Sequence, residues 1–363
     1  VVGQIPSALI GKGTGQLHEL PNQLAIAEGL TKFAARMDAP EDAHPTIAEA
    51  FRQLHTGRPR PVHVEMAMDI MKSEGPVMPI DAPEAYERAQ PDPDQIAAAA
   101  KILGEAKNPL IFAGGGAVDA GVELKALAEL LQAPVVMSRG ALGVIDSRHP
   151  LALTQPHGHV LWKDADVVLG VGTRLVPMVP AWGSDDGLAF IRLDLDAKEM
   201  TRSQTPAVAV QADAALGLAA LCDAVPGYNI KRADCTDDMA GLKAALQREF
   251  EKLNPQVPIL DAIRCALPED GIFVEELTQP GYVARMVFPV YRPRTYINPG
   301  YQGTLGYASP TAMGAKVGMP DRNVLAISGD GGFMFNVQEL ATAAQHGIDI
   351  VLVVFNDGAF GNV

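Results

Sequence analysis

The feature that most constrains the fold is a series of short, continuous apolar segments that alternate with helical patterns between residues 94 and 225. The predicted helices are Gln95–Ala106 and Val122–Leu131, and a triple-glycine turn, Gly114–Gly116, precedes the second of them. Strands that are apolar on both faces are typical of parallel sheets covered by helices on both sides. The sequence therefore predicts an α/β fold with a doubly wound sheet. Its predicted strands are Pro109–Ala113, Ala133–Met137, Asp166–Val171 and Ala189–Asp194.

Two further α/β patterns flank this region, and each has too few strands for a whole sheet. The chain opens at Val1, without Met, on what reads as a strand end, and it stops shortly after the strand Ile350–Phe355. We therefore expect the gene product to extend beyond both ends. The predicted segments are an incomplete first domain at 1–75, a proline-rich linker at 76–93, a central domain at 94–225, a linker with a connecting helix at 226–257, and an incomplete last domain at 258–363.

Charge and cysteine usage limit the possible partners. The 29 basic and 43 acidic side chains give a formal charge of −14, which disfavours nucleic acid and anionic membranes as partners. No window approaches 18 consecutive apolar residues, so we expect no membrane span. Three irregularly spaced cysteines fit a reducing compartment, and the cytoplasm is the predicted location.

Two carboxylates follow neighbouring strands near the end of the chain. The apolar strand Val324–Ile327 leads into Gly329-Asp-Gly331, and the next apolar strand ends in Asn356-Asp357. Open α/β sheets bind ligands at the carboxyl ends of their strands, where oxygen ligands suit Mg²⁺ and glycines let backbone N–H groups approach phosphates. A lone Gly-Asp-Gly is more often a structural turn. With the predicted helix Asn336–Gln345 and the second strand between the two turns, the pattern favours a metal and phosphate site.

This combination resembles the thiamine diphosphate motif of the acetolactate synthase and 2-oxo acid decarboxylase family, and the stretch Gly303–Ala315 is similar to the family's segment before the motif. The resemblance covers the whole chain. It implies three doubly wound domains, namely a pyrimidine-binding, a central and a diphosphate-binding domain, of which the first and last are incomplete here. It also implies thiamine diphosphate and Mg²⁺ as cofactors.

The resemblance assigns site residues by position. Asp330, Asp357 and the backbone carbonyl at Ala359 match the metal ligands, although Asp357 stands where relatives usually carry Asn. Leu305 matches the apolar residue that holds the cofactor bent, with a plain core leucine as the alternative. The residues implied to touch the cofactor elsewhere are Gly303 through its carbonyl, Thr278 and Gln279 unless they form a solvated turn, and Gly329, Gly331, Gly332 and Phe360.

Other polar residues carry weaker implications. Gln16 and His18 lie in a segment that resembles a loop near the substrate, with a solvent-exposed His18 as the alternative, whereas His63 on a strand reads as a structural histidine. The family's activating Glu would lie upstream of Val1. His157 is expected in a solvated loop. A turn like Gly114–Gly116 can hold a nucleotide phosphate, and some relatives bind FAD in the central domain whereas others bind nothing there, so FAD is possible but less favoured than a central domain without it.

The resemblance implies an enzyme that acts on a small 2-oxo acid such as pyruvate, with acetolactate synthase-like decarboxylation and carboligation. A cofactor must supply the electron sink for such chemistry. A simple 2-oxo acid decarboxylase and an acyloin lyase are alternatives within the family. A non-catalytic cofactor-binding scaffold, or a flavin or nicotinamide protein, is the alternative of another class. A homodimer or homotetramer is implied as well.

Overall fold

The computed structural model describes residues 1–76, 86–176, 178–184, 187–359 and 361. The predicted linker 76–93 therefore lies partly outside the described residues. The chain divides into two compact units, residues 1–89 and 90–363, and each is described by itself. The described strands form three sheets, and all their pairings are parallel. The predicted α/β class is confirmed.

The first unit holds a three-stranded sheet in the order β1-β3-β2. The strand expected around His63 is observed as β3, but β2 is not anticipated because Phe33-Ala-Ala-Arg-Met lacks regular alternation. The core contains Met37, Ala50 and Val64. The elements of this unit are β1 (Val2–Gln4), α1 (Gln23–Leu30), β2 (Phe33–Met37), α2 (Ala43–His55), β3 (Val62–Ala67) and α3 (Met68–Lys72).

The second unit begins with a six-stranded sheet in the order β6-β5-β4-β7-β8-β9. The structure has strands at all four positions predicted for this region, and it adds β6 and β9 at the two edges. Both edge strands are short and contain few large apolar residues. The strands are β4 (Pro109–Ala113), β5 (Val135–Met137), β6 (Ala152–Thr154), β7 (Val167–Val171), β8 (Ala189–Asp194) and β9 (Val208–Gln211).

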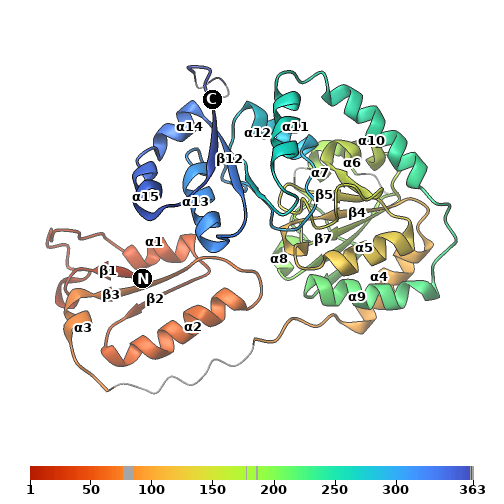
Figure 1. Cartoon of the computed structure of the whole chain (residues 1–363). Helices are drawn as coiled ribbons and strands as arrows, with labels where there is room; N and C mark the ends of the chain where they lie inside the picture. The colour runs from red at the N-terminus through yellow and green to blue at the C-terminus, as the bar shows by residue number, and fades with distance from the viewer. Residues whose placement is uncertain (77–85, 177, 185–186, 360, 362–363) are drawn as a thin grey trace. The chain divides into compact units, whose positions relative to one another are not determined.

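Helices cover both faces of this sheet (Figure 1). Helix α9 (Ala214–Ala224) packs against both α4 (Pro93–Glu105) and α5 (Gly121–Leu131). On the other face, Phe112 packs with Trp162 of α6 (Gln155–Trp162). Successive residues of β4 thus join different clusters, as a doubly wound sheet requires.

The expectation of a solvated loop is wrong for His157, because α6 buries its side chain. Burial lowers the pKa of the His157 imidazole to about 4, and the nearby Lys243 contributes in the same direction. The Thr154 hydroxyl lies 2.9 Å from the His157 ring nitrogen Nδ1 and donates to the backbone carbonyl of Met286.

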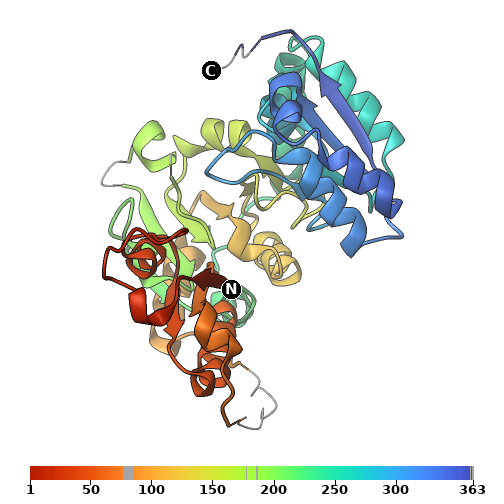
Figure 2. The ribbon, with the colours of Figure 1, turned by 90° about the vertical axis from the view of Figure 1, so that its left-hand side faces the viewer.

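The last sheet has the order β11-β10-β12-β13 and is sandwiched between helices (Figures 1 and 2). Alternate residues along its strands pack toward α11 and α12 on one face and toward α13 on the other, and α13 contacts α15. The elements are α11 (Gln256–Ala266), β10 (Ile272–Val274), α12 (Gln279–Val287), β11 (Tyr296–Ile297), α13 (Ala308–Gly318), β12 (Val324–Gly329), α14 (Asp330–Phe335), α15 (Glu339–His346) and β13 (Val351–Phe355).

One predicted helix in this region is wrong at its start. The sequence predicts a helix over 336–345, but the chain is already helical from Asp330, and Asn336 caps the end of α14. The glycines of the Gly-Asp-Gly stretch hide this first turn, since glycine is a poor helix former. The remaining α-helices of the second unit are α7 (Met178–Trp182), α8 (Ala197–Met200) and α10 (Thr236–Phe250).

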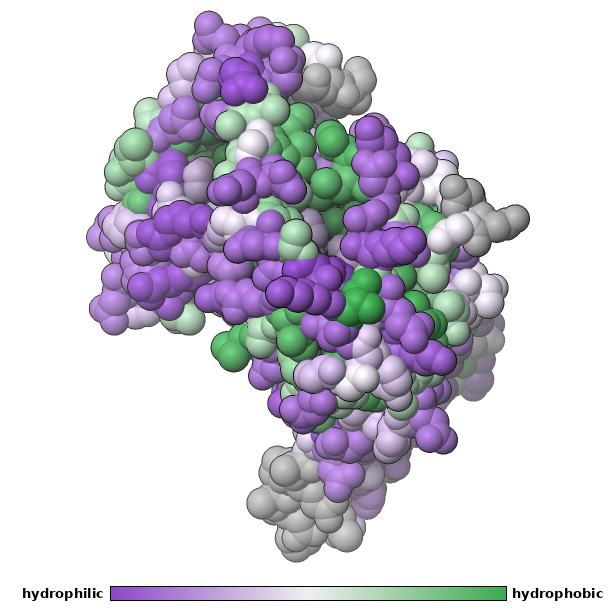
Figure 3. All heavy atoms as spheres, turned by 90° about the vertical axis from the view of Figure 1, so that its right-hand side faces the viewer, coloured by the Kyte–Doolittle hydropathy of each residue, from purple (hydrophilic) through white to green (hydrophobic). Residues whose placement is uncertain are grey.

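The surface is mixed. On the face shown in Figure 3, hydrophilic residues cover most of the area, and hydrophobic residues appear between them in small groups. Among the described residues, no helix combines the length and the apolar character needed to cross a membrane.

Candidate active site

A cavity of about 400 Å³ lies at the carboxyl end of the last sheet. It is formed by the segment after β10, the turn after β12 and the turn after β13, with residues of α11 and Leu305 completing the wall. Its lining residues are Pro255, Gln256, Ile259, Leu277, Thr278, Gln279, Pro280, Leu305, Gly329, Asp330, Gly331, Gly332, Phe355, Asn356, Asp357, Ala359 and Gly361.

Hydrogen bonds join the two turns that carry the carboxylates. The backbone N–H of Gly358 donates to the Asp330 carboxylate over 3.2 Å and to the Asn356 side-chain oxygen over 2.9 Å. The N–H of Ala359 donates to Asp357 over 3.1 Å. Strands β12 and β13 are neighbours in register, with Gly329 opposite Phe355, so Asp330 and Asn356 follow directly from paired positions. The sheet therefore places both carboxylates in the wall of one cavity.

The residues of this wall fit a diphosphate. Helix α14 begins at Asp330, and the first backbone N–H groups of a helix have no acceptor within the helix, so they are available to an anion. The three glycines Gly329, Gly331 and Gly332 keep side chains away from this backbone. The cavity volume also falls within the range of about 300–1,000 Å³ that is usual for small-molecule sites.

The same wall offers oxygen ligands to a hard cation. Asp330, Asp357 and Asn356 present side-chain oxygens, and Mg²⁺ prefers such ligands completed by phosphate and water oxygens. Within the described ranges, His, Cys, Asp and Glu nowhere gather in groups of three or more suited to a metal. Two carboxylates alone would leave most of an octahedral shell to the diphosphate, the Ala359 carbonyl and water.

The other predicted cofactor contacts divide into three groups. Thr278, Gln279 and Leu305 line the cavity. Thr278 is buried at the start of α12, which excludes a solvated position for it, whereas Gln279 is exposed and the alternative stays open there. Gly303 lies two residues before Leu305 with a positive φ of 60°, in contact range of Leu277, but it is not part of the lining. Phe360 lies outside the described residues.

The predicted substrate residues belong to the first unit. Gln16 and His18 are both exposed, and His18 has a positive φ of 69°. The structure shows no ligand contact for either, so their role stays a prediction.

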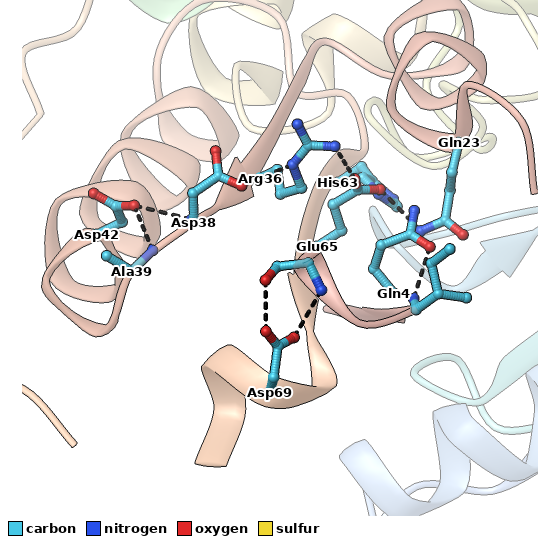
Figure 4. A network of polar contacts seen from close by, with 11 residues as sticks. Gln4, Gln23, Arg36, Asp38, Ala39, Asp42, His63, Glu65 and Asp69 are labelled. Carbon is cyan, nitrogen blue, oxygen red and sulfur yellow. Dashed lines mark hydrogen bonds and ion pairs between the residues drawn. The ribbon is translucent and has the colours of Figure 1, made fainter. Parts of the chain in front are cut away.

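Figure 4 shows a different polar cluster in the same unit, centred on the buried Glu65. Gln23 donates to Glu65 over 2.8 Å, and His63 lies 3.2 Å from the same carboxylate oxygen. Arg36 forms an ion pair with Glu65 at 3.6 Å. The interpretation of His63 as a structural histidine agrees with this arrangement.

Sequence reasoning missed two adjacent carboxylates beside the cavity. Glu275 and Glu276 follow β10 directly, and both are fully buried. The Tyr296 hydroxyl donates to Glu275, Arg285 pairs with the same carboxylate at 3.5 Å, and burial raises the pKa of Glu275. Glu276 accepts hydrogen bonds from backbone and hydroxyl groups next to the cavity. The available signal was the pair of acids at a strand's carboxyl end, but glutamates are seldom fully buried.

A parallel sheet with a glycine-lined helix start and two carboxylates at its carboxyl edge defines a class of α/β proteins that bind phosphorylated cofactors through a metal. Comparison with known families narrows this class. Residues 96–221 match the central domain of thiamine pyrophosphate enzymes, and residues 278–363 match their C-terminal domain, which binds thiamine pyrophosphate. The chain belongs to the thiamine diphosphate-dependent enzyme family of acetolactate synthase and 2-oxo acid decarboxylase type.

Several curated proteins resemble the chain along its length. It is 34% identical to a probable 2-ketoarginine decarboxylase of Pseudomonas aeruginosa over 98% of the chain and 65% of that protein. It is 33% identical to the acetolactate synthase large subunit of Corynebacterium glutamicum over 100% of the chain and 61% of that protein. It is 30% identical to the large subunit of acetolactate synthase isozyme 1 of Escherichia coli over 100% of the chain and 66% of that protein. The chain thus spans less than two thirds of the length of these relatives.

Proposed function

We propose that the protein is a thiamine diphosphate- and Mg²⁺-dependent enzyme that decarboxylates a small 2-oxo acid such as pyruvate and transfers the remaining group to a second carbonyl compound, as the name acetolactate synthase implies. The observation that carries the proposal is that Asp330, Asp357 and Leu305, assigned by resemblance from separate segments, line one cavity with the glycine turn. A thiazolium cofactor supplies the electron sink that side chains lack.

The chain's own residues would bind and orient this cofactor. Asp330, Asp357 and the Ala359 carbonyl would hold Mg²⁺, and the N–H groups at the start of α14 would hold the diphosphate. Leu305, which also lines the cavity, would press on the cofactor's rings and keep them in a bent conformation. Such positioning brings reacting groups together and thereby lowers the barrier for proton transfer.

The test uses the full-length gene product, loaded with thiamine diphosphate and Mg²⁺ and given pyruvate. We expect CO₂ release together with a new carbon–carbon bond, measured as acetolactate. Aldehyde as the only product would instead support a simple decarboxylase, and cleavage of an acyloin without CO₂ release would support a lyase. A protein that binds the cofactor but converts none of a panel of 2-oxo acids, aldehydes and acyloins would be a binding scaffold, and the proposal would be wrong.

A second candidate function is decarboxylation of 2-ketoarginine. It is favoured by the 34% identity to a protein with that probable activity, which slightly exceeds the 33% and 30% identities to the acetolactate synthases named above. The same preparation should therefore be assayed with 2-ketoarginine and pyruvate in parallel. A kcat/KM for 2-ketoarginine at least tenfold above that for pyruvate would favour this candidate, whereas the reverse ratio would favour the first.

We also propose a homodimer or homotetramer located in the cytoplasm. Met334, Phe335 and Leu340 of the α14–α15 region are at least 44% exposed, and an apolar surface beside the cavity would suit a second subunit. Sedimentation should show a dimer or tetramer whose dissociation releases the cofactor. FAD in the central domain stays an open, less favoured prediction, and the absorption spectrum of the purified protein tests it.

A further inference from the structure

Glu276 is a buried carboxylate that binds two of the segments forming the cavity wall without lining the cavity itself. It is fully buried at the end of β10 and accepts hydrogen bonds from the N–H of Gly306, from the N–H of Ala308 over 3.3 Å and from the Ser328 hydroxyl over 2.6 Å. A buried carboxylate is retained only where donors compensate its lost hydration. These three donors come from two segments that lie far from Glu276 in the sequence.

Each segment held by Glu276 continues directly into the cavity wall. Gly306 and Ala308 follow Leu305, and Ser328 precedes Gly329 and Asp330. The residues after Glu276 itself, Leu277 to Pro280, also line the cavity. One side chain therefore connects the segment before α12, the Leu305 segment and the Gly-Asp-Gly turn.

The geometry around Glu276 leaves little freedom for these segments. A Cβ added to Gly332 would lie 2.1 Å from the Glu276 oxygen Oε1, so the glycine turn sits directly against the carboxylate. Gly306 has a positive φ of 77°, and its carbonyl accepts a 2.6 Å hydrogen bond from the Asn336 side chain. The peptide units that flank Gly306 are thus fixed on both sides, by Glu276 at its N–H and by Asn336 at its carbonyl.

We propose that Glu276 is a positioning residue of the cofactor site, which sets the place of Leu305 relative to the turn that carries Asp330. The inference rests on the proposed function. In this role, the Glu276 carboxylate determines the distance between Leu305, which would keep the cofactor bent, and the Gly-Asp-Gly turn, which would bind diphosphate and Mg²⁺. A buried glutamate with only a structural role would contribute to folding stability without determining this distance.

The test is Glu276→Gln with Glu275→Gln as the matched control, both in the full-length protein. The amide keeps the shape of the side chain but cannot accept on both sides, so at least one of the N–H groups of Gly306 and Ala308 loses its acceptor. Glu275 is its neighbour, is equally buried and also accepts a hydrogen bond, but its partners Tyr296 and Arg285 do not line the cavity.

Two measurements distinguish a positioning role of Glu276 from a purely structural role. Amide hydrogen exchange of the cofactor-free protein should become at least tenfold faster at 305–308 and 329–332 in Glu276→Gln, but not in Glu275→Gln. Calorimetry should show thiamine diphosphate affinity reduced about tenfold or more in Glu276→Gln at saturating Mg²⁺, and unchanged within threefold in Glu275→Gln. Thermal unfolding shows whether both variants fold.

Several results would overturn the inference. Unchanged exchange at both segments would remove the positioning role even if the cofactor binds. Equal losses of affinity in the two variants would show that Glu276 acts only through general stability. Wild-type protein that binds no thiamine diphosphate would overturn the proposed function and the inference with it, whereas normal cofactor binding without any enzymatic turnover would affect the proposed function alone.

Discussion

Two glycine-rich turns in the second unit have similar sequences and different surroundings. Gly114–Gly116 follows β4 in the central sheet, and Gly329–Gly332 follows β12 in the last sheet. At the first turn, the N–H groups of Gly114 and Gly116 donate to the backbone of β7 and of Gly172 over 2.9 and 3.1 Å. At the second, a helix begins at once and its first residues border a cavity.

The difference lies in what the glycines accommodate. A Cβ at Gly114 would lie 2.2 Å from the carbonyl oxygen of Gly172, so the missing side chain makes room for a neighbouring strand. A Cβ at Gly332 would meet the Glu276 carboxylate at 2.1 Å, while the other side of the turn stays open to the cavity. Glycine spacing therefore indicates close approach of a backbone, and the surroundings decide whether a ligand or the protein itself approaches.

The largest expected difference between the two turns is the effect on cofactor affinity of removing a carboxylate near each of them. Asp330→Ala should weaken thiamine diphosphate binding in the presence of Mg²⁺ by roughly 100-fold, about 2.8 kcal/mol, because the metal loses a charged ligand. The matched control is Asp119→Ala after the first turn, where the carboxylate is 76% exposed and pairs with Arg294. Calorimetry of both variants is the measurement. Equal affinities in the two would contradict the assignment of the metal site.

Adding a methyl group to each turn should have opposite consequences. Gly114→Ala should cost about 2 kcal/mol of unfolding free energy, since it overpacks rigid backbone, and leave cofactor affinity unchanged. Gly332→Ala should displace Glu276 and lower cofactor affinity about tenfold. Urea unfolding and calorimetry on both variants give the comparison. It would fail if Gly114→Ala reduced cofactor binding as much as Gly332→Ala did.

Truncating Leu305 tests the part of the cavity wall that is expected to keep the cofactor bent. Leu305→Ala should lower kcat about tenfold while changing cofactor affinity less than threefold, because the metal and diphosphate contacts remain. Leu305 is only half-buried, so the variant should stay folded. Steady-state kinetics at saturating cofactor provide the measurement. A loss confined to stability, with kcat intact, would identify Leu305 as an ordinary packing residue.

The smallest expected effect is a decrease in unfolding free energy at acid pH, caused by His157 in the central domain. His157 has a pKa of about 4 in the folded protein, below its value of roughly 6.5 when unfolded, so protonation favours the unfolded chain. Unfolding free energy should therefore fall by about 1 kcal/mol between pH 6 and pH 5 through this group. His157→Gln should remove that part of the slope in urea titrations and leave cofactor affinity at pH 7 unchanged. An identical slope in the variant would show that His157 does not titrate as described.

The sequence predicts the strongly apolar strands well because burial on both faces leaves an unambiguous pattern. The strands Pro109–Ala113 and Ala189–Asp194 are observed with the predicted bounds. The strand β2 was missed because its Arg36 faces a partner, Glu65, that is distant in sequence. A charged residue in such a pair interrupts the apolar pattern from which a buried strand is predicted.

For the site, the resemblance to the family assigned individual residues, and the structure then showed which of them line one cavity. Asp330, Leu305 and Thr278 are up to 52 positions apart, and no local pattern states that they meet. Glu276 was not predicted for a further reason. A charged side chain after a strand is expected to be solvated, and the donors that compensate its burial are distant in the sequence. Long-range compensation of a buried charge is a property of the fold and not of the local sequence.

The hydrogen bonds of Glu276 carry a lesson for protein design. A designer who copied the cavity lining onto another parallel-sheet scaffold would transfer the glycines, the aspartates and the leucine, all visible from the inside of the pocket. The transplant would still lack the carboxylate behind the wall and its partners Gly306, Ala308 and Ser328. Grafting this site would therefore require its hidden support as a unit, with Glu276 installed before any residue that a ligand would touch.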